Sequence, residues 1–148
     1  MPDAHKIIAL AADHGGFDMK CRIAEFLKTA GYEVLDLGTH SAERVDYPDY
    51  GYALAEAIAA GKAERGIALC GSGIGISIAV NRNPKARAAL CHDVTSTRLS
   101  RQHNDANVLA LGARLIGIDV ALECVQIFLN TAFEGGRHAE RVKKLGKC

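Results

Sequence analysis

The sequence predicts an α/β protein with a Rossmann-like, doubly wound sheet of five parallel strands, formed as a single domain over residues 1–148. Short apolar segments alternate along the chain with amphipathic segments of helical period. Residues 5–12 form a nearly continuous apolar run, which is typical of a strand buried on both faces of a parallel sheet. The 148 residues are 49% apolar and 24% charged, so one core can be buried without a disulfide or metal staple.

The expected elements follow one another in strict alternation. Strands, each an apolar run ended by a turn, are expected at 5–12, 32–37, 66–70, 86–91 and 107–111. Helices are expected at 17–30, 50–60, 74–82, 93–103, 118–131 and 137–145. Gly31 ends the first helix, and Asn83-Pro84 ends the third. This alternation requires β-α-β crossovers, so we expect the strands to run parallel.

Extra C-terminal helices extend beyond the five β-α units. Their apolar side chains include Val125, Ile127, Phe128 and Leu129. Such a face suits two roles, a subunit interface or a cover for the sheet, and the sequence leaves both open.

A cysteine and three alternating glycines occupy the centre of the chain. Cys70 ends an expected strand, Gly71, Gly73 and Gly75 follow, and a helix is expected to begin at Ile74. Peptide N–H groups at such a turn can hold a negative oxygen, and the positive helix end favours a thiolate. The pattern therefore predicts a base or nucleophile beside an oxyanion cradle. A buried apolar cysteine beside a tight turn or a nucleotide site is the alternative, although the glycine spacing fits neither common nucleotide motif.

Other polar residues follow the ends of the first two strands. Asp13 and His14 come after the first strand, and Asp46 and Tyr47 lie in the long polar loop after the second. Because the carboxyl ends of parallel strands meet at one edge of the sheet, we expect these residues to lie near Cys70.

The remaining candidates are expected at a distance from that edge. His103 and Asn104 lie at the far end of the fourth helix, so they point away from Cys70 in their own subunit and could reach a site in a symmetric partner. Arg137 and Arg141 project from one face of the last helix, as a phosphate grip or as a solvated basic face. Arg114, just after the fifth strand, leaves the same two alternatives open.

Charge and hydropathy exclude several classes of protein. Eighteen basic and seventeen acidic side chains leave a net charge of +1, which favours neither nucleic acid nor a membrane surface as a partner. The apolar run of residues 7–12 is too short for a signal peptide or a membrane span, so a cytoplasmic location is expected.

The cysteines and histidines form no recognisable metal or redox motif. Five cysteines without a C-x-x-C pair indicate free thiols, of which Cys21, Cys91 and Cys124 are expected to be packing residues. No metal and no cofactor is expected, since neither H-E-x-x-H nor a close cysteine/histidine cluster occurs. The other histidines are left structural or unassigned; they are His5, His40, His92 and His138.

Five motifs in order give the chain a specific resemblance. They are Asp13-His14-Gly15-Gly16, Tyr47-Pro48-Asp49-Tyr50, Cys70-Gly71-Ser72-Gly73-Ile74-Gly75, His103-Asn104 and Glu134-Gly135-Gly136-Arg137-His138. With them the chain resembles the type B ribose-5-phosphate isomerases, a family that also includes galactose-6-phosphate and allose-6-phosphate isomerases. The resemblance implies an aldose–ketose isomerase that works on a sugar phosphate through an enediolate, without a metal. It also implies a homodimer or homotetramer with an active site shared between subunits.

The resemblance assigns catalytic roles by position. Cys70 matches the base that moves a proton between C1 and C2, His103 matches the residue that assists ring opening, and Asp13 matches a residue near the ring oxygen. Ser72 supplies a hydroxyl where threonine is common. The cradle for the enediolate oxygen corresponds to Gly71, Ser72, Gly73, Ile74 and Gly75. One branch of the family carries a glutamate base at the position of Gly75, so this chain resembles the cysteine branch.

The substrate contacts follow from the same matches. Phosphate ligands correspond to His14, Arg114, Arg137 and Arg141, and further substrate contacts to Tyr47 and Asn104. The expected reaction is the interconversion of D-ribose 5-phosphate and D-ribulose 5-phosphate. Isomerases of allose 6-phosphate, galactose 6-phosphate or a tetrose phosphate are the alternatives.

Two rival functions differ in class from an isomerase. A cysteine-dependent phosphatase needs an arginine six positions after its cysteine, where this chain has Ile76. A non-catalytic sugar-phosphate sensor on the same fold would leave Cys70, Asp13 and His103 without a chemical role.

Overall fold

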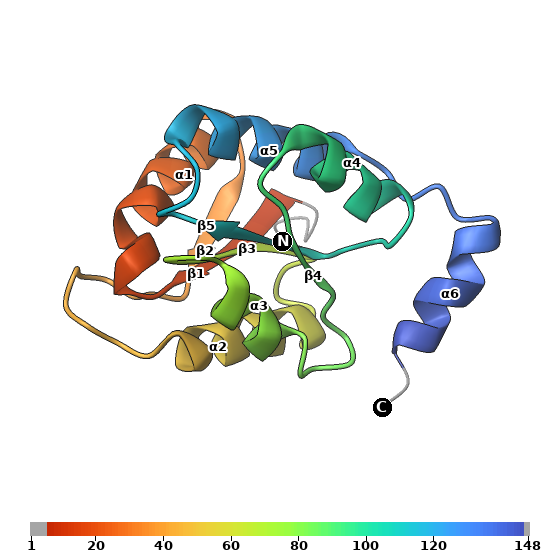
Figure 1. Ribbon diagram of the computed structural model, residues 1–148, viewed down its shortest axis with the longest axis horizontal. Helices are drawn as coiled ribbons and strands as arrows, with labels where there is room; N and C mark the ends of the chain where they lie inside the picture. The colour runs from red at the N-terminus through yellow and green to blue at the C-terminus, as the bar shows by residue number, and fades with distance from the viewer. Residues whose placement is uncertain (1–5, 147–148) are drawn as a thin grey trace.

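A computed structural model describes residues 6–146 as a five-stranded sheet between layers of helices (Figure 1). The strands are β1 (Ile7–Ala12), β2 (Glu33–Asp36), β3 (Arg65–Cys70), β4 (Ala88–Leu90) and β5 (Val108–Gly112). The helices are η2 (His14–Gly16), α1 (Phe17–Thr29), α2 (Tyr47–Ala59), α3 (Ile74–Val80), α4 (Val94–Gln102), α5 (Ile118–Asn130) and α6 (Arg137–Leu145). All neighbouring strands pair in parallel in the order β2-β1-β3-β5-β4. The predicted fold class is confirmed.

Each face of the sheet carries its own core. Ile8 and Leu10 of β1 join the core under α1 and α5, whereas the alternating Ala9 and Ala11 join the core under α2 and α3. All four residues are at most 1% exposed, as expected for a strand covered on both faces. In Figure 1, α1, α4 and α5 form the upper layer and α2 and α3 form the lower one.

The strand order creates a switch point between β1 and β3. The chain leaves β1 for β2 on one side of the sheet and then crosses to β3 on the other side. Backbone hydrogen bonds join the loops there, because Asp13 N–H donates to the Leu69 carbonyl at 3.2 Å and Ala113 N–H donates to the Cys70 carbonyl at 3.0 Å. Ligands of open parallel sheets bind in the crevice at such a point.

The two C-terminal helices differ in how they pack. The α5 residues Ala121, Cys124, Val125 and Phe128 are fully buried against the sheet, so this helix covers the core. Helix α6 projects from the body of the molecule at the right of Figure 1.

Several boundaries and one side chain differ from expectation. Helix α2 begins at Tyr47 rather than at residue 50, because Pro48 is well suited to the first turn of a helix. Strand β4 is shorter than expected, since as an edge strand it pairs only with β5, along residues 88–90. Cys21 was expected to pack in the core, but it lies on the outer side of α1 and is exposed. His5 and Cys148 lie outside the described residues.

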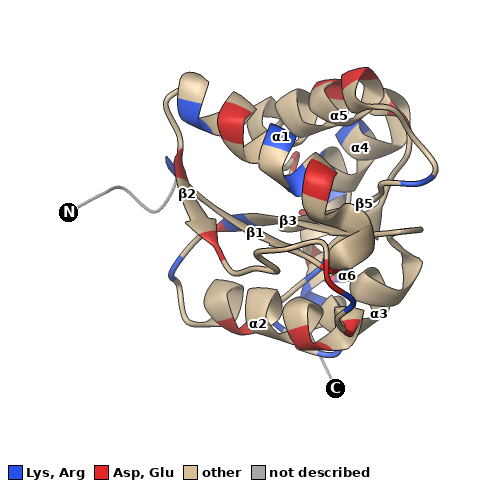
Figure 2. Cartoon of the chain, turned by 90° about the vertical axis from the view of Figure 1, so that its left-hand side faces the viewer, with Lys and Arg blue, Asp and Glu red and all other residues tan. Residues whose placement is uncertain are grey.

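The surface carries both signs of charge. Figure 2 shows basic and acidic residues on the helices of both layers, in line with the net charge of +1. Within residues 6–146, none of the helices has the length and apolar character needed to cross a membrane.

Candidate active site

Cys70 lies at the switch point, at the carboxyl end of β3. Its side chain is 4% exposed, and the N–H of Gly73 donates a hydrogen bond to Sγ at 3.1 Å. This bond fixes the sulfur atom beside the glycine turn that leads into α3.

The turn after Cys70 requires glycine at position 73. Gly73 has φ of 76°, in the left-handed region, and a Cβ there would lie 2.8 Å from the carbonyl carbon of Leu111. Ser72 lies two residues before the start of α3, and its Oγ accepts a hydrogen bond from the N–H of Ile74 at 3.2 Å. The peptide groups of this turn therefore approach β5 closely and stay next to the sulfur atom.

Tyr47 packs directly on Gly75. A Cβ at Gly75 would lie 2.5 Å from Cε1 of the Tyr47 ring. Any side chain at this position therefore requires the Tyr47 ring to move.

The loop after β1 brings a carboxylate and an imidazole to the same edge. Asp13 is 7% exposed, and its Oδ1 accepts hydrogen bonds from the N–H groups of Gly15 at 2.9 Å and Gly16 at 3.3 Å. The N–H of Val45 donates to Nδ1 of His14 at 3.2 Å. Nδ1 also lies 3.2 Å from the carbonyl oxygen of Val45, so Val45 holds the imidazole ring in place in either tautomer.

Arg114 covers the glycine turn from the side of β5. Its N–H donates to the Gly71 carbonyl at 2.9 Å. Its side chain lies so close that a Cβ at Gly71 would be 3.3 Å from Cδ. A cation thus stands beside the cysteine and its turn.

Asp13, Tyr47, Cys70 and Arg114 line one cavity of about 560 Å³. Its lining combines Asp13, Tyr47, Cys70, Gly71, Ser72, Ile74, Gly75 and Arg114 with the apolar Ile78 and Leu115. A groove of similar volume, about 580 Å³, runs beside α1. Volume alone therefore does not identify the site; the convergence of a thiol, a carboxylate, a guanidinium group and peptide donors does.

The other candidate residues form a second cluster at the end of α4. His103 caps α4, and its ring stacks on that of His138 with 4.3 Å between centroids and 13° between planes. His103, Asn104, His138 and Arg141 line a shallow cavity of about 320 Å³. Burial, together with the charges of Arg137 and His103, lowers the pKa of His138, and only Glu134 among its close neighbours opposes this effect.

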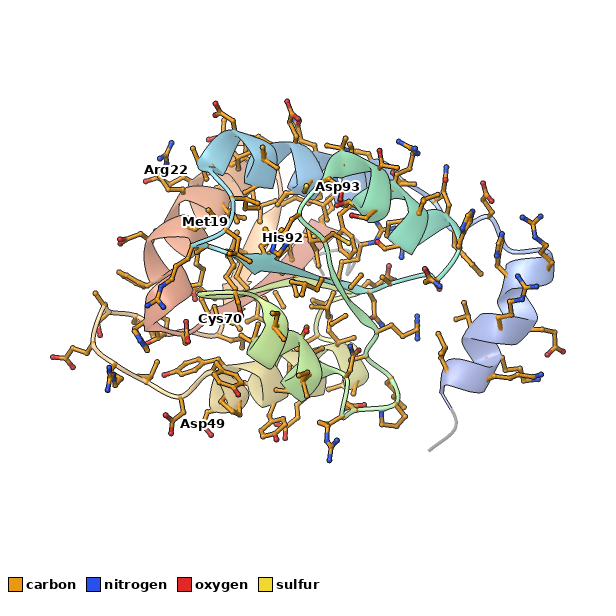
Figure 3. All side chains as sticks on the ribbon, viewed as in Figure 1. Met19, Arg22, Asp49, Cys70, His92 and Asp93 are labelled. Carbon is orange, nitrogen blue, oxygen red and sulfur yellow. The ribbon has the colours of Figure 1, made fainter. Side chains whose placement is uncertain are left out.

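The two clusters are well separated within one chain. In Figure 3, Cys70 lies toward the left of the sheet, whereas α6, which carries Arg137 and Arg141, stands at the far right. One chain therefore places the Cys70 thiol and the Arg114 guanidinium group in one cavity, and two histidines near two arginines of α6 at another place.

Sequence reasoning left two members of the second cluster without a role. Glu134 and His138 are four residues apart, a spacing that brings side chains together at the start of a helix, but His138 was only classed as structural or unassigned. The apolar Ile78 and Leu115 carry no chemical signal, so only the structure places them in the first cavity.

Comparison with known proteins gives concordant matches over nearly the whole chain. A family model described as Ribose/Galactose Isomerase matches residues 8–145. Ribose-5-phosphate isomerase B of Escherichia coli (strain K12) is 47% identical over 140 residues, which cover 95% of this chain and 94% of that protein. D-erythrulose-4-phosphate isomerase of Pectobacterium atrosepticum is 44% identical over 140 residues, covering 94% and 92%. The solved structure of Clostridium thermocellum ribose-5-phosphate isomerase B is 54% identical, with a TM-score of 0.94 and 95% coverage of both chains.

Proposed function

The chain belongs to the ribose/galactose isomerase family, and we propose that it interconverts D-ribose 5-phosphate and D-ribulose 5-phosphate in the cytoplasm. As a member of this family it is an aldose–ketose isomerase of sugar phosphates. The observation that carries the proposed mechanism is Cys70, whose Sγ accepts a hydrogen bond from the Gly73 N–H in a cavity shared with Asp13.

The reaction begins with ring opening, because only the open-chain aldose has a carbonyl group at C1. His103 assists by passing a proton to the ring oxygen as the bond from that oxygen to C1 breaks, while the C1 hydroxyl gives its proton to the carboxylate of Asp13 and becomes the carbonyl group. Asp13 is already fixed by the N–H groups of Gly15 and Gly16, so it needs no rearrangement to do so.

Proton transfer between the two carbons then falls to Cys70. The thiolate takes the proton from C2, the electrons of that C–H bond form the C1–C2 double bond, and the carbonyl oxygen becomes an enediolate oxygen. Returning the proton to C1, while the O2 hydroxyl proton passes to O1, gives the ketose. Within residues 71–75, the N–H groups of Gly73 and Ile74 already donate to Cys70 Sγ and Ser72 Oγ, so the other N–H groups of this turn stabilise the negative oxygen. General base and oxyanion stabilisation commonly contribute about 3–5 kcal/mol each.

The phosphate group is bound at a distance from the reacting carbons. Arg114 lines the Cys70 cavity, and His14 follows Asp13 in the loop after β1. Arg141 lines the His103 cavity, and Arg137 lies close enough to His138 to affect it electrostatically. A dianion held by guanidinium groups supplies binding energy that can be used to orient C1 and C2 against the thiolate.

The separation of the two clusters supports an active site shared between subunits. Ring opening needs His103 and proton transfer needs Cys70, yet the chain holds them in different cavities. A symmetric homodimer, alone or paired as a tetramer, brings the His103 cluster of one subunit against the Cys70 cavity of the other.

The test is turnover in heavy water. The purified, metal-free protein is incubated with ribose 5-phosphate in D₂O and followed by proton NMR. Ribulose 5-phosphate that carries solvent deuterium at C1 supports the enediolate route. Absence of turnover would contradict the assignment of ribose 5-phosphate, and six-carbon and four-carbon sugar phosphates would then be assayed.

A tetrose phosphate is the second candidate substrate. The 44% identity to D-erythrulose-4-phosphate isomerase of Pectobacterium atrosepticum is close to the 47% identity to ribose-5-phosphate isomerase B of Escherichia coli. A kcat/KM for a tetrose phosphate above that for ribose 5-phosphate would replace the first assignment and keep the mechanism.

A further inference from the structure

Three possible metal ligands converge at the end of α4. Nε2 of His103 lies 3.8 Å and Nε2 of His138 lies 3.7 Å from the same oxygen, Oε1 of Glu134. The three ligand atoms all lie within 4.8 Å of one another. A backbone hydrogen bond from Glu134 N–H to the Gln102 carbonyl at 3.1 Å ties the turn that carries Glu134 to the end of α4.

His138 provides an independent indication that this cluster binds something. Its Nε2 is the one buried side-chain polar atom within residues 6–146 that has no hydrogen-bond partner. The residue is 6% exposed, and the Glu134 oxygen at 3.7 Å is too distant for a hydrogen bond. A buried nitrogen left without a partner costs free energy, and native structures usually satisfy such an atom.

The donor set matches a borderline dication. Two imidazole nitrogens and one carboxylate oxygen are typical three-protein-ligand zinc sites, with a fourth position left to water or another ligand. Tetrahedral ligands at about 2.1 Å from zinc are about 3.4 Å apart. The two histidine–glutamate distances exceed this by only a few tenths of an ångström. The two imidazole rings are stacked with 13° between their planes, so His103 must also turn out of the stack before both in-plane lone pairs can meet at one ion; its half-exposed side chain has room to turn.

A proton shared with Glu134 explains the cluster less well. A single proton can bridge the carboxylate to one imidazole only, whereas both nitrogens face the same oxygen at nearly equal distances. Arg137 and Arg141 stand close enough to affect His138 electrostatically, and their charges oppose any added cation. We therefore expect weaker binding than at a structural zinc site.

We infer that His103, Glu134 and His138 form a site for Zn²⁺ or a similar transition-metal dication, and that the bound ion inhibits the isomerase by holding His103. The inhibitory part rests on the proposed function, in which His103 opens the sugar ring. The binding part rests only on the geometry of the three side chains.

Zinc binding can be measured without turnover. The full-length Cys70→Ala variant, stripped of metal, removes the competing thiolate of the first cavity and is titrated with Zn²⁺ by calorimetry. We expect one ion per chain. Adding Glu134→Gln or His138→Asn should weaken binding by at least about tenfold, since changes even outside the ligand shell commonly cost that much. His40→Asn, at an exposed histidine before α2, is the control and should leave the affinity unchanged.

Two further measurements separate this inference from the proposed function. Zinc X-ray absorption should report nitrogen and oxygen ligands without sulfur, and Zn²⁺ should inhibit the wild-type isomerase at the concentration at which it binds. Failure of Cys70→Ala to bind zinc, sulfur ligation, or equal affinity in the Glu134→Gln and His138→Asn variants would overturn the site. Failure of turnover with every sugar phosphate would instead overturn the proposed function, because the binding result does not depend on it.

Discussion

Cys70 combines burial at the end of a strand with a backbone donor to its sulfur. Replacing it with alanine removes the proposed base and only one heavy atom, so the fold should persist. We expect Cys70→Ala to lower kcat by about 10²–10⁴-fold with little change in KM, the usual contribution of a general base. Steady-state kinetics and circular dichroism check this. A folded variant with more than a tenth of wild-type kcat would exclude Cys70 as the base.

Gly73 offers a prediction with an internal control. Both Gly73 and Gly61 have positive φ, 76° and 74°, but a Cβ at Gly73 would collide with Leu90 and the backbone of Leu111, whereas one at Gly61 meets nothing within 4 Å. Gly61→Ala should cost about 1–2 kcal/mol of unfolding free energy from the left-handed conformation alone. Gly73→Ala should cost a further 1–3 kcal/mol or so from overpacking. Urea denaturation measures the difference, and equal losses would contradict the close approach.

Many of the residues that line the first cavity can be predicted from the sequence, and there are physical reasons why other residues cannot be predicted. The thiol, carboxylate and glycines that line the first cavity all lie at or just after strand ends, which the apolar pattern of the chain locates. His138 does not stand out, because its role depends on a ring from another helix that stacks against it. Cys21 falls in a segment of apolar helical period, yet its position on the helix turns it outward.

At the scale of elements, α1 is tied to β2 by an ion pair. Nζ of Lys20 lies 2.6 and 2.8 Å from the two carboxylate oxygens of Asp36, and the lysine side chain is 1% exposed against 37% for the aspartate. The two partners therefore have unequal access to water. Removing Asp36 leaves a buried cation alone, whereas removing Lys20 leaves an anion that water can reach.

This asymmetry predicts unequal losses of stability. Asp36→Asn should cost about 3 kcal/mol, the usual penalty for an uncompensated buried charge. Lys20→Met should cost about 1 kcal/mol, because the exposed carboxylate is rehydrated and the methionine fills the space. Urea denaturation at neutral pH compares the two variants. A greater loss for Lys20→Met would contradict the prediction.

The same pair predicts a dependence of stability on pH. Burial opposes ionisation of Asp36, but hydrogen bonds from Lys20 and the Gly38 N–H, with the charge of Lys20, outweigh it and hold the pKa below its usual value. A carboxyl group whose pKa is lowered on folding stabilises the protein above its unfolded pKa of about 3.9 and loses this effect as pH falls toward the folded value. The stability difference between wild type and Asp36→Asn should therefore shrink below about pH 4. A difference that grows with acidification would contradict the pKa shift.

Boundaries of elements are less predictable than their existence. Every expected strand and helix is present, because apolar periodicity reports which faces are buried. The start of α2 at Tyr47 agrees with a local signal, Pro48 in the first turn. The short β4 depends on its place at the edge of the sheet, a tertiary fact that a local pattern does not contain.

At the scale of the molecule, the sequence predicts that His103 points away from the edge that carries Cys70. The structure has the same arrangement, with the two residues in separate cavities. The sequence does not predict which side chains lie next to His103. Glu134 reaches it from the turn before α6, and His138 reaches it from α6 itself. The proposed active site, shared between two subunits, would bring Cys70 of one chain to His103 of the other.

An active site shared between subunits makes a quantitative prediction for mixed dimers. Cys70→Ala and His103→Asn homodimers should each be nearly inactive, because each site lacks one group. Hybrids formed by coexpression or refolding contain one site in which both groups are intact. Random pairing of equal amounts makes half the dimers hybrid, so about a quarter of wild-type activity should return.

The matched control uses two changes on the same half of the site. His103→Asn and Arg141→Gln both alter the cluster at α6 and the end of α4, so each of the two sites in their hybrid still carries one defect. This mixture should gain no activity over its components. If the first mixture stays inactive, each chain completes its own site, and the separation of Cys70 from His103 must then be closed by movement within one subunit. Equal recovery of both mixtures would contradict the shared site, because the gain would then not depend on pairing an intact Cys70 with an intact His103.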